Sequence, residues 1–145
     1  MMKTSLPIKF VPKGWGFEKW IVNNEEYCGK LLYFVKDKRC SWHYHVLKDE
    51  VFYIQSGRLL VRYGDTDEIT GAKEIILGPG DNFHVYRGLR HQMVAIEDTE
   101  MFEFSTQHFD EDSYRLIKGY ELSNGSRGPV AININCDKPA CGFFR

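Results

Sequence analysis

The sequence predicts a single-domain, all-β protein. The chain of 145 residues is long enough to bury one core without disulfide support. Aromatic residues make up 14% of it, and it contains 13 glycines and 5 prolines. Turn signals recur at spacings of roughly 8–12 residues, which is typical of short strands joined by tight turns.

Composition narrows the function classes. The formal net charge is −1 and no basic block stands out, so nucleic acid is not expected as a partner. No apolar stretch approaches the length of a membrane span, and the N-terminus lacks the apolar core of a signal peptide. We therefore expect a soluble, cytoplasmic protein with no membrane partner and with reduced cysteines.

The chain divides into three parts. Residues 1–13 read as an extended N-terminal arm, because Pro7 and Pro12 disfavour a helix. Residues 14–108 carry the alternating and apolar runs of a β-domain, and residues 109–145 form an irregular C-terminal extension. Within the β-domain, strands are expected at 14–22, 27–35, 43–45, 51–54, 58–63, 74–77, 82–86, 93–96 and 101–106.

Four residues have the spacing of a metal site. His43 and His45 are two apart, so both side chains leave the same face of an extended strand. A turn at 46–49 would bring Glu50 beside them, and His91 follows the strand at 82–86. Imidazoles and a carboxylate suit one divalent Zn, Mn, Fe, Co or Ni ion. Four protein ligands would leave one or two positions open for substrate, which is typical of a catalytic site.

The same residues resemble the signature of a known family. His-x-His-x4-Glu-x6-Gly ends at Gly57, and Gly-x7-Gly-x2-His ends at His91. Together they are similar to the two-part motif of the cupin superfamily, over roughly residues 14–108. The resemblance implies a small jelly-roll barrel in which three histidines and the glutamate bind one metal. Three turn or packing positions depart from the family's usual Gly, Pro and Asn, namely Asp37, Tyr86 and Ala95.

A Trp-Gly pair at the start of the β-domain is similar to the start of the cupin domain in type II phosphomannose isomerases. This likeness implies a metal-dependent isomerase or epimerase acting on a carbohydrate or sugar phosphate. Such a reaction needs a base that is not a metal ligand. Glu103 is the first candidate and His84 the second, although alternation alone does not show which face of 101–106 lies inside.

An anionic substrate would also need cations, for which Lys30, Arg39 and Arg87 are candidates. Lys30 either reaches into the interior or extends to water at the end of its strand.

Two other functions stay open. An Fe- or Ni-dependent dioxygenase would need an apolar cavity, which Phe34, Phe52, Ile54 and Met93 could line. A non-enzymatic protein could instead bind a sugar or small acid through the metal. The habit of the family and the exposed edge strands indicate a homodimer.

Overall fold

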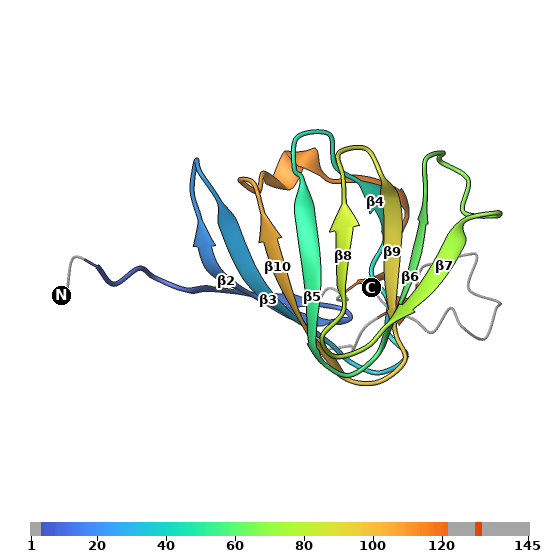
Figure 1. Cartoon of the computed structure of the whole chain (residues 1–145), viewed down its shortest axis with the longest axis horizontal. Helices are drawn as coiled ribbons and strands as arrows, with labels where there is room; N and C mark the ends of the chain where they lie inside the picture. The colour runs from blue at the N-terminus through green and yellow to red at the C-terminus, as the bar shows by residue number, and fades with distance from the viewer. Residues whose placement is uncertain (1–3, 122–129, 132–145) are drawn as a thin grey trace.

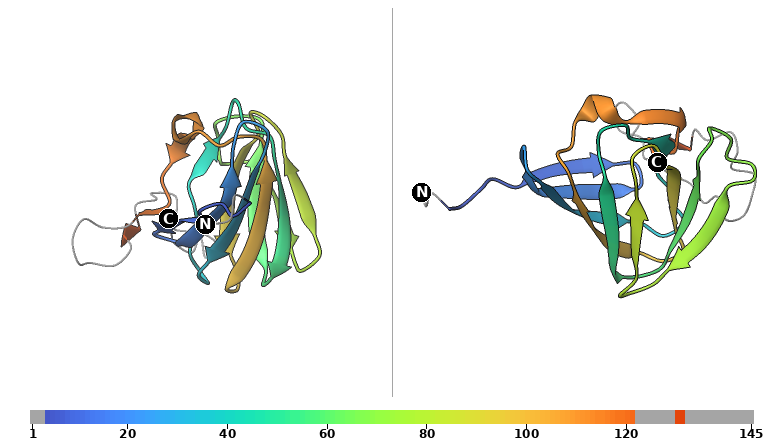
Figure 2. Two further views of the ribbon diagram at one scale, coloured as in Figure 1. Left: turned by 90° about the vertical axis from the view of Figure 1, so that its left-hand side faces the viewer. Right: turned by 45° about the horizontal axis from the view of Figure 1, so that its top comes forward.

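The computed structural model of the chain describes residues 4–121 and 130–131, which fold into two antiparallel sheets facing each other (Figures 1 and 2). The six-stranded sheet has the order β1-β2-β3-β10-β5-β8, and the five-stranded sheet has the order β11-β4-β9-β6-β7. The result is a jelly roll, the all-β class that the sequence predicts. No helix in the described part of the chain is long and apolar enough to cross a membrane.

The six-stranded sheet contains β1 (Lys9–Lys13), β2 (Gly16–Asn23), β3 (Cys28–Phe34), β10 (Thr99–Ser105), β5 (Glu50–Ser56) and β8 (Asn82–Val85). The five-stranded sheet contains β11 (Tyr114–Ile117), β4 (Trp42–Tyr44), β9 (Arg90–Ala95), β6 (Leu59–Gly64) and β7 (Lys73–Leu77). A short 3-10 helix, η1 (Asp110–Asp112), precedes β11, and β12 (Tyr120–Glu121) pairs separately with β13 (Val130–Ala131).

The core lies between the sheets, and the period-two alternation of the strands fills it. In β3, for example, Leu32 and Phe34 are buried while Leu31 and Tyr33 are only partly covered. The buried cluster takes side chains from both sheets: Trp15, Leu32, Phe34, Cys40, Phe52, Ile54, Leu59, Val61, Leu77, Val85, Leu89, Met93, Ala95 and Met101.

Two turn positions explain features of the motif. Gly57 has φ +88°, and a Cβ there would lie 2.2 Å from the carbonyl oxygen of Asp98, so a side chain cannot be accommodated. Asp37, which stands where the family usually has glycine, has φ 71°. Aspartate is among the few residues with a side chain that visit this left-handed region, so the departure keeps the local backbone geometry.

Both ends of the expected β-domain extend further than its predicted limits. Lys9–Lys13, expected as part of an arm, is strand β1 and pairs in register with β2. Tyr114–Ile117, expected in the irregular extension, is strand β11 and pairs with β4. Between β10 and β11 the chain passes over one end of the strands (orange in Figure 2). The two added strands are the first in their respective sheets.

Candidate metal centre

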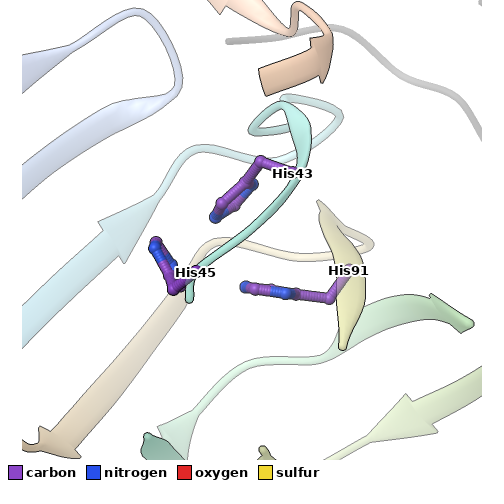
Figure 3. Close-up of side chains that lie close together, drawn as sticks. All are labelled: His43, His45 and His91. Carbon is purple, nitrogen blue, oxygen red and sulfur yellow. The ribbon is translucent and has the colours of Figure 1, made fainter. Parts of the chain in front are cut away.

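The four predicted ligands come from both sheets and meet in the interior. His43 on β4 lies directly opposite His91 on β9 in the strand ladder. His45 follows β4, and Glu50 is the first residue of β5 in the facing sheet. Figure 3 shows the three imidazole rings turned toward a common space.

The ligand atoms of the three histidines lie within 4.8 Å of one another. Glu50 Oε2 lies 3.4 Å from Nε2 of both His45 and His91. Glu50 Oε2 and His91 Nε2 are buried and have no hydrogen-bond partner among the described residues. Buried polar atoms without partners are costly, and a cation bound between them would remove that cost.

Main-chain carbonyls set the orientation of each ring through its Nδ1 atom. The Nδ1 atoms lie 2.8 Å from the oxygen of Ser41 for His43, 3.0 Å from that of Asp112 for His45, and 2.9 Å from that of Leu89 for His91. A carbonyl only accepts hydrogen bonds, so each Nδ1 carries the hydrogen and each Nε2 presents a lone pair. This is the usual outer shell of metal-binding histidines.

The electrostatics favour the protonation states that bind metal. Burial lowers the pKa of His43 well below its usual range, and the neighbouring rings of His91 and His45 lower it further. Burial alone would raise the pKa of Glu50, but the ammonium of Lys48 holds that pKa well below its usual value. A neutral imidazole beside an ionised carboxylate is the donor set of a divalent transition metal, so these residues fit the expected ion.

Asp112 holds the loop between β4 and β5, which carries His45 and Lys48. Its buried carboxylate accepts hydrogen bonds from the backbone N–H groups of Val46, Leu47 and Lys48, at 2.9, 3.0 and 3.0 Å. Its carbonyl oxygen is the partner of His45 Nδ1. Sequence reasoning missed this residue, because no local pattern relates position 112 to positions 45–48.

The candidate metal centre opens into a cavity of about 380 Å³. The cavity wall is lined by Lys9, Val11, Lys13, Trp15, Glu18, Trp20, Lys30, Leu32, Cys40, Ser41, His43, His45, Lys48, Glu50, Phe52, His91, Met93, Glu103, His108, Asp110, Ser113 and Arg115. Both charged and apolar side chains therefore face the space next to the candidate ligands.

Glu103 lies on the inner face of β10 and is 4% exposed. Its Oε2 atom is 2.9 Å from Lys48 Nζ, 3.9 Å from Lys30 Nζ and 3.3 Å from Ser105 Oγ. Lys48 Nζ is also 3.3 Å from Glu50 Oε1, so one ammonium joins the candidate ligand to the second carboxylate. Burial alone would lower the pKa of Lys48, but Glu103 and Glu50 raise it above its ordinary value. Lys48 is therefore a positively charged donor between the two carboxylates.

His108 is a further cavity residue that sequence reasoning missed. Its Nδ1 is 3.2 Å from Lys48 Nζ and its Nε2 is 3.0 Å from Asp110 Oδ1. Burial, and then the charges of Lys30 and Lys48, lower the pKa of His108 to about 4. The imidazole is thus neutral near pH 7 and lies edge-on to Trp20, with 4.8 Å between ring centroids.

The structure brings some of the other candidate residues to the cavity but not all of them. Lys30 lines the cavity and is 1% exposed, with its ammonium 3.7 Å from Glu18. His84 lies on the outer face of β8, where it is exposed and 2.9 Å from Asp49 Oδ1. Its neighbour Val85 takes the inner position instead, as strand alternation requires.

Two arginines also lie outside the cavity. Arg39 is fully buried beside β9, where its backbone bridges to Val94. Arg87 is exposed and donates from Nε to the carbonyl oxygen of Leu47 at 2.8 Å. Neither side chain is part of the cavity wall.

Comparison with solved structures shows the same fold. Capsular polysaccharide assembling protein CapF from Staphylococcus aureus superposes with a TM-score of 0.64 at 16% identity, over 77% of this chain and 34% of that chain. KdgF from Halomonas sp. superposes with a TM-score of 0.60 at 18% identity, over 76% of this chain and 94% of that chain. Oxalate decarboxylase from Bacillus subtilis superposes with a TM-score of 0.66 at 18% identity, over 75% of this chain and 30% of that chain. The chain thus spans about a third of the length of CapF and of oxalate decarboxylase.

Sequence comparison identifies the family. No curated protein sequence shows significant similarity to the chain. The profile of the family described as "Cupin domain" matches residues 32–105, which is half of the chain and includes all four candidate ligands. By this match, and with the jelly-roll fold to support it, the chain belongs to the cupin family.

Proposed function

We propose that this protein is a metal-dependent isomerase or epimerase of a small carbohydrate or sugar phosphate. The observation that carries the proposal is the position of Glu103, a buried carboxylate that shares one cavity with His43, His45, Glu50 and His91. A base beside a metal site is the minimum that proton transfer between neighbouring carbons needs.

A divalent metal bound by the four candidate ligands would polarise a substrate carbonyl and its neighbouring hydroxyl. Glu50 is then occupied as a ligand, so Glu103 acts as the base. Glu103 removes the proton from the hydroxyl-bearing carbon next to the carbonyl and returns it to the former carbonyl carbon. The hydroxyl proton moves to the former carbonyl oxygen, so the carbonyl and the hydroxyl exchange positions. Lys48 and Lys30 hold the Glu103 carboxylate through Oε2, and Oε1 makes no hydrogen bond to a described residue.

The character of the cavity supports acid–base chemistry over the apolar site expected for a dioxygenase. Of the four apolar residues considered for such a site, Phe52 and Met93 line the cavity, whereas Phe34 and Ile54 are buried elsewhere in the core. The wall beside the candidate ligands carries Glu103 and Lys48 instead. Proton transfer uses such groups directly.

The test is exchange of substrate protons with solvent. The protein is loaded with Mn²⁺ or Zn²⁺ and incubated in D₂O with a panel of aldoses, ketoses, their phosphates and sugar acids, and NMR follows loss of the proton next to the carbonyl. Glu103→Gln should abolish exchange while keeping the metal. Glu100→Gln is the matched control, because Glu100 lies on the outer face of the same strand and accepts a hydrogen bond from Ser56 Oγ.

Exchange at the wild-type rate in Glu103→Gln would show that Glu103 is not the base. Binding of a sugar without exchange in the wild-type protein would favour the non-enzymatic binding function.

We further propose that the protein is a cytoplasmic homodimer. Edge strands with exposed apolar side chains support association, as on β7, where Ile75 and Ile76 are 39% and 50% exposed. Light scattering of the purified protein tests the homodimer directly, and a monomeric mass at micromolar concentration would contradict dimerisation.

A further inference from the structure

The edge strand β1 presents a basic face to the cavity. Lys9, Val11 and Lys13 are alternate residues of this strand, and all three line the cavity wall. Phe10 lies on the opposite face, with its ring centroid 5.1 Å from that of Phe17. The two lysines therefore share the side of β1 that faces the candidate metal centre.

The edge strand of the other sheet adds a third cation. Arg115 on β11 pairs in register with His43 on β4, and its side chain lines the same cavity. Residues directly opposite each other in an antiparallel ladder point to the same face. Arg115 thus extends on the side of β4 from which His43 reaches the candidate metal centre.

The charges of the cavity wall do not balance. Five cations (Lys9, Lys13, Lys30, Lys48 and Arg115) face four carboxylates (Glu18, Glu50, Glu103 and Asp110). A divalent ion at the candidate metal centre would add two further positive charges, in a chain whose net charge is −1. A cavity with a net positive charge attracts ligands of the opposite sign.

The cations of the cavity wall differ in exposure and in whether they form ion pairs. Lys30 and Lys48 are buried and form ion pairs with the interior carboxylates. Lys9 and Arg115 are exposed, and neither forms an ion pair with a carboxylate of the described residues. The Lys9 ammonium is 4.5 Å from the ring centroid of Trp20, a contact that leaves it able to accept an anionic partner.

We propose that Lys9 and Arg115, assisted by Lys13, bind an anionic group of the substrate at the outer end of the cavity, while the metal centre holds the reacting end. The substrate is therefore an anionic carbohydrate, either a sugar acid recognised through its carboxylate or a sugar phosphate recognised through its phosphate. Guanidinium and ammonium groups bind both kinds of oxyanion. This inference deepens the proposed function and rests on it for the position of the reacting end.

Binding rather than turnover tests the inference. Isothermal titration of the full-length, Mn²⁺-loaded protein uses glucuronate, glucose 6-phosphate and glucose as probes. We expect one of the two anionic sugars to bind at least about tenfold more tightly than glucose, and its affinity to fall as salt rises. The identity of that sugar distinguishes carboxylate from phosphate recognition.

A double variant and a matched control locate the anion site. Lys9→Met/Arg115→Gln should weaken binding of the preferred anionic sugar by more than about tenfold. The affinity of this double variant for glucose should equal that of the wild type. Lys19→Met/Arg58→Gln removes the same charge from exposed positions outside the cavity wall and should bind as the wild type does. Lys19 pairs with Phe10 on the far face of the sheet, so it is a close match for Lys9.

The outcomes separate the two proposals. Equal affinity for glucose and the anionic sugars, failure of both anionic sugars to bind, or equal losses in both double variants would overturn the inference. Tight binding that depends on Lys9 and Arg115, without any proton exchange in D₂O, would sustain the anion site and reject isomerisation.

Discussion

Each histidine of the candidate metal centre is oriented by a carbonyl that the chain supplies nearby or from a distance. His43 and His91 use carbonyls two residues before them, at Ser41 and Leu89, so their orientation is local. His45 uses the carbonyl of Asp112, 67 residues away. The ring nitrogens are therefore arranged by the folded backbone before any ion binds, which favours tight binding.

Glu50 is the one negatively charged candidate ligand, and its charge can be removed with little change of shape. Glu50→Gln keeps the size of the side chain but presents a neutral amide to a divalent ion. We expect metal affinity to fall by more than about tenfold, measured as metal content after dialysis and by competition with a chelator. Asp49→Asn is the control, because Asp49 pairs with His84 on the outer surface and should leave the metal content unchanged. Full metal occupancy in Glu50→Gln would remove Glu50 from the ligand set.

His108 predicts how stability depends on pH. Its folded pKa is about 4, below the ordinary value of 6.5, so between these values the unfolded chain binds a proton that the folded protein does not. Above pH 6.5 His108 is neutral in both states and does not reduce the free energy of unfolding. As the pH decreases toward 4, proton binding by the unfolded chain lowers the free energy of unfolding by up to about 3 kcal/mol. Urea unfolding of wild type and His108→Asn at several pH values measures the difference. Identical pH dependence in the two proteins would contradict this assignment.

The convergence of the four candidate ligands could be predicted from the sequence because their positions follow from strand period and turn length. His43 and His45 share a face for the same reason in any strand. The contacts of Lys48 with Glu103 and with His108 could not be predicted, since each joins residues more than fifty positions apart. Spacing along the chain carries no information about such contacts.

At the scale of the elements, β10 shows why the alternation of side chains alone does not predict which face of a strand lies inside. Its two faces carry Phe102 and Phe104 on one side and Met101 and Glu103 on the other. The usual apolar-inside pattern favours burying the phenylalanines, yet Phe104 is 56% exposed and Glu103 is 4% exposed. The charged cavity reverses the rule locally, because Lys30 and Lys48 neutralise the buried carboxylate.

The η1 helix fixes the loop between β4 and β5 through Asp112. Asp112→Ala leaves three backbone N–H groups without their acceptor and frees the loop that carries His45 and Lys48. We expect a loss of about 3 kcal/mol in unfolding free energy, with weaker metal binding. Asp112→Asn keeps one carboxamide oxygen as an acceptor and should recover part of both.

Chemical denaturation and metal titration of both variants measure these effects. Glu111→Ala is the control, since Glu111 is exposed on the same short helix. Wild-type metal affinity in Asp112→Ala would show that the loop keeps its position without this anchor.

At the scale of the whole molecule, the matched family region and the folded unit differ in extent. The family profile covers residues 32–105, whereas the sheets also include β1, β2 and β11. The sequence did not reveal β1 as a strand because it includes Pro12, and it did not reveal β11 because its four residues lie in a segment without a clear alternating pattern. Proline is tolerated at an edge, where its missing N–H group need not bond to a neighbour. These strands nevertheless supply the outer wall of the cavity.

The candidate metal centre also links the two sheets. His43 and His91 belong to the five-stranded sheet, and Glu50 belongs to the six-stranded sheet. The unfolded chain does not hold these ligands together, so an ion that binds the folded protein stabilises the whole jelly roll. At a free metal concentration one hundred times the dissociation constant, the gain is about 2.7 kcal/mol, and the melting temperature should rise by roughly 5–10 °C.

Thermal unfolding followed by circular dichroism measures this shift, starting from protein stripped with a chelator and adding Mn²⁺, Zn²⁺, Fe²⁺, Co²⁺ or Ni²⁺ in turn. The ion with the largest shift identifies the preferred metal among those tried. His91→Ala lacks one ligand and should show a much smaller shift with that ion, while its fold without metal persists. If no ion raises the melting temperature of the wild type, or if His91→Ala responds equally, then the convergence of His43, His45, Glu50 and His91 does not create a metal site.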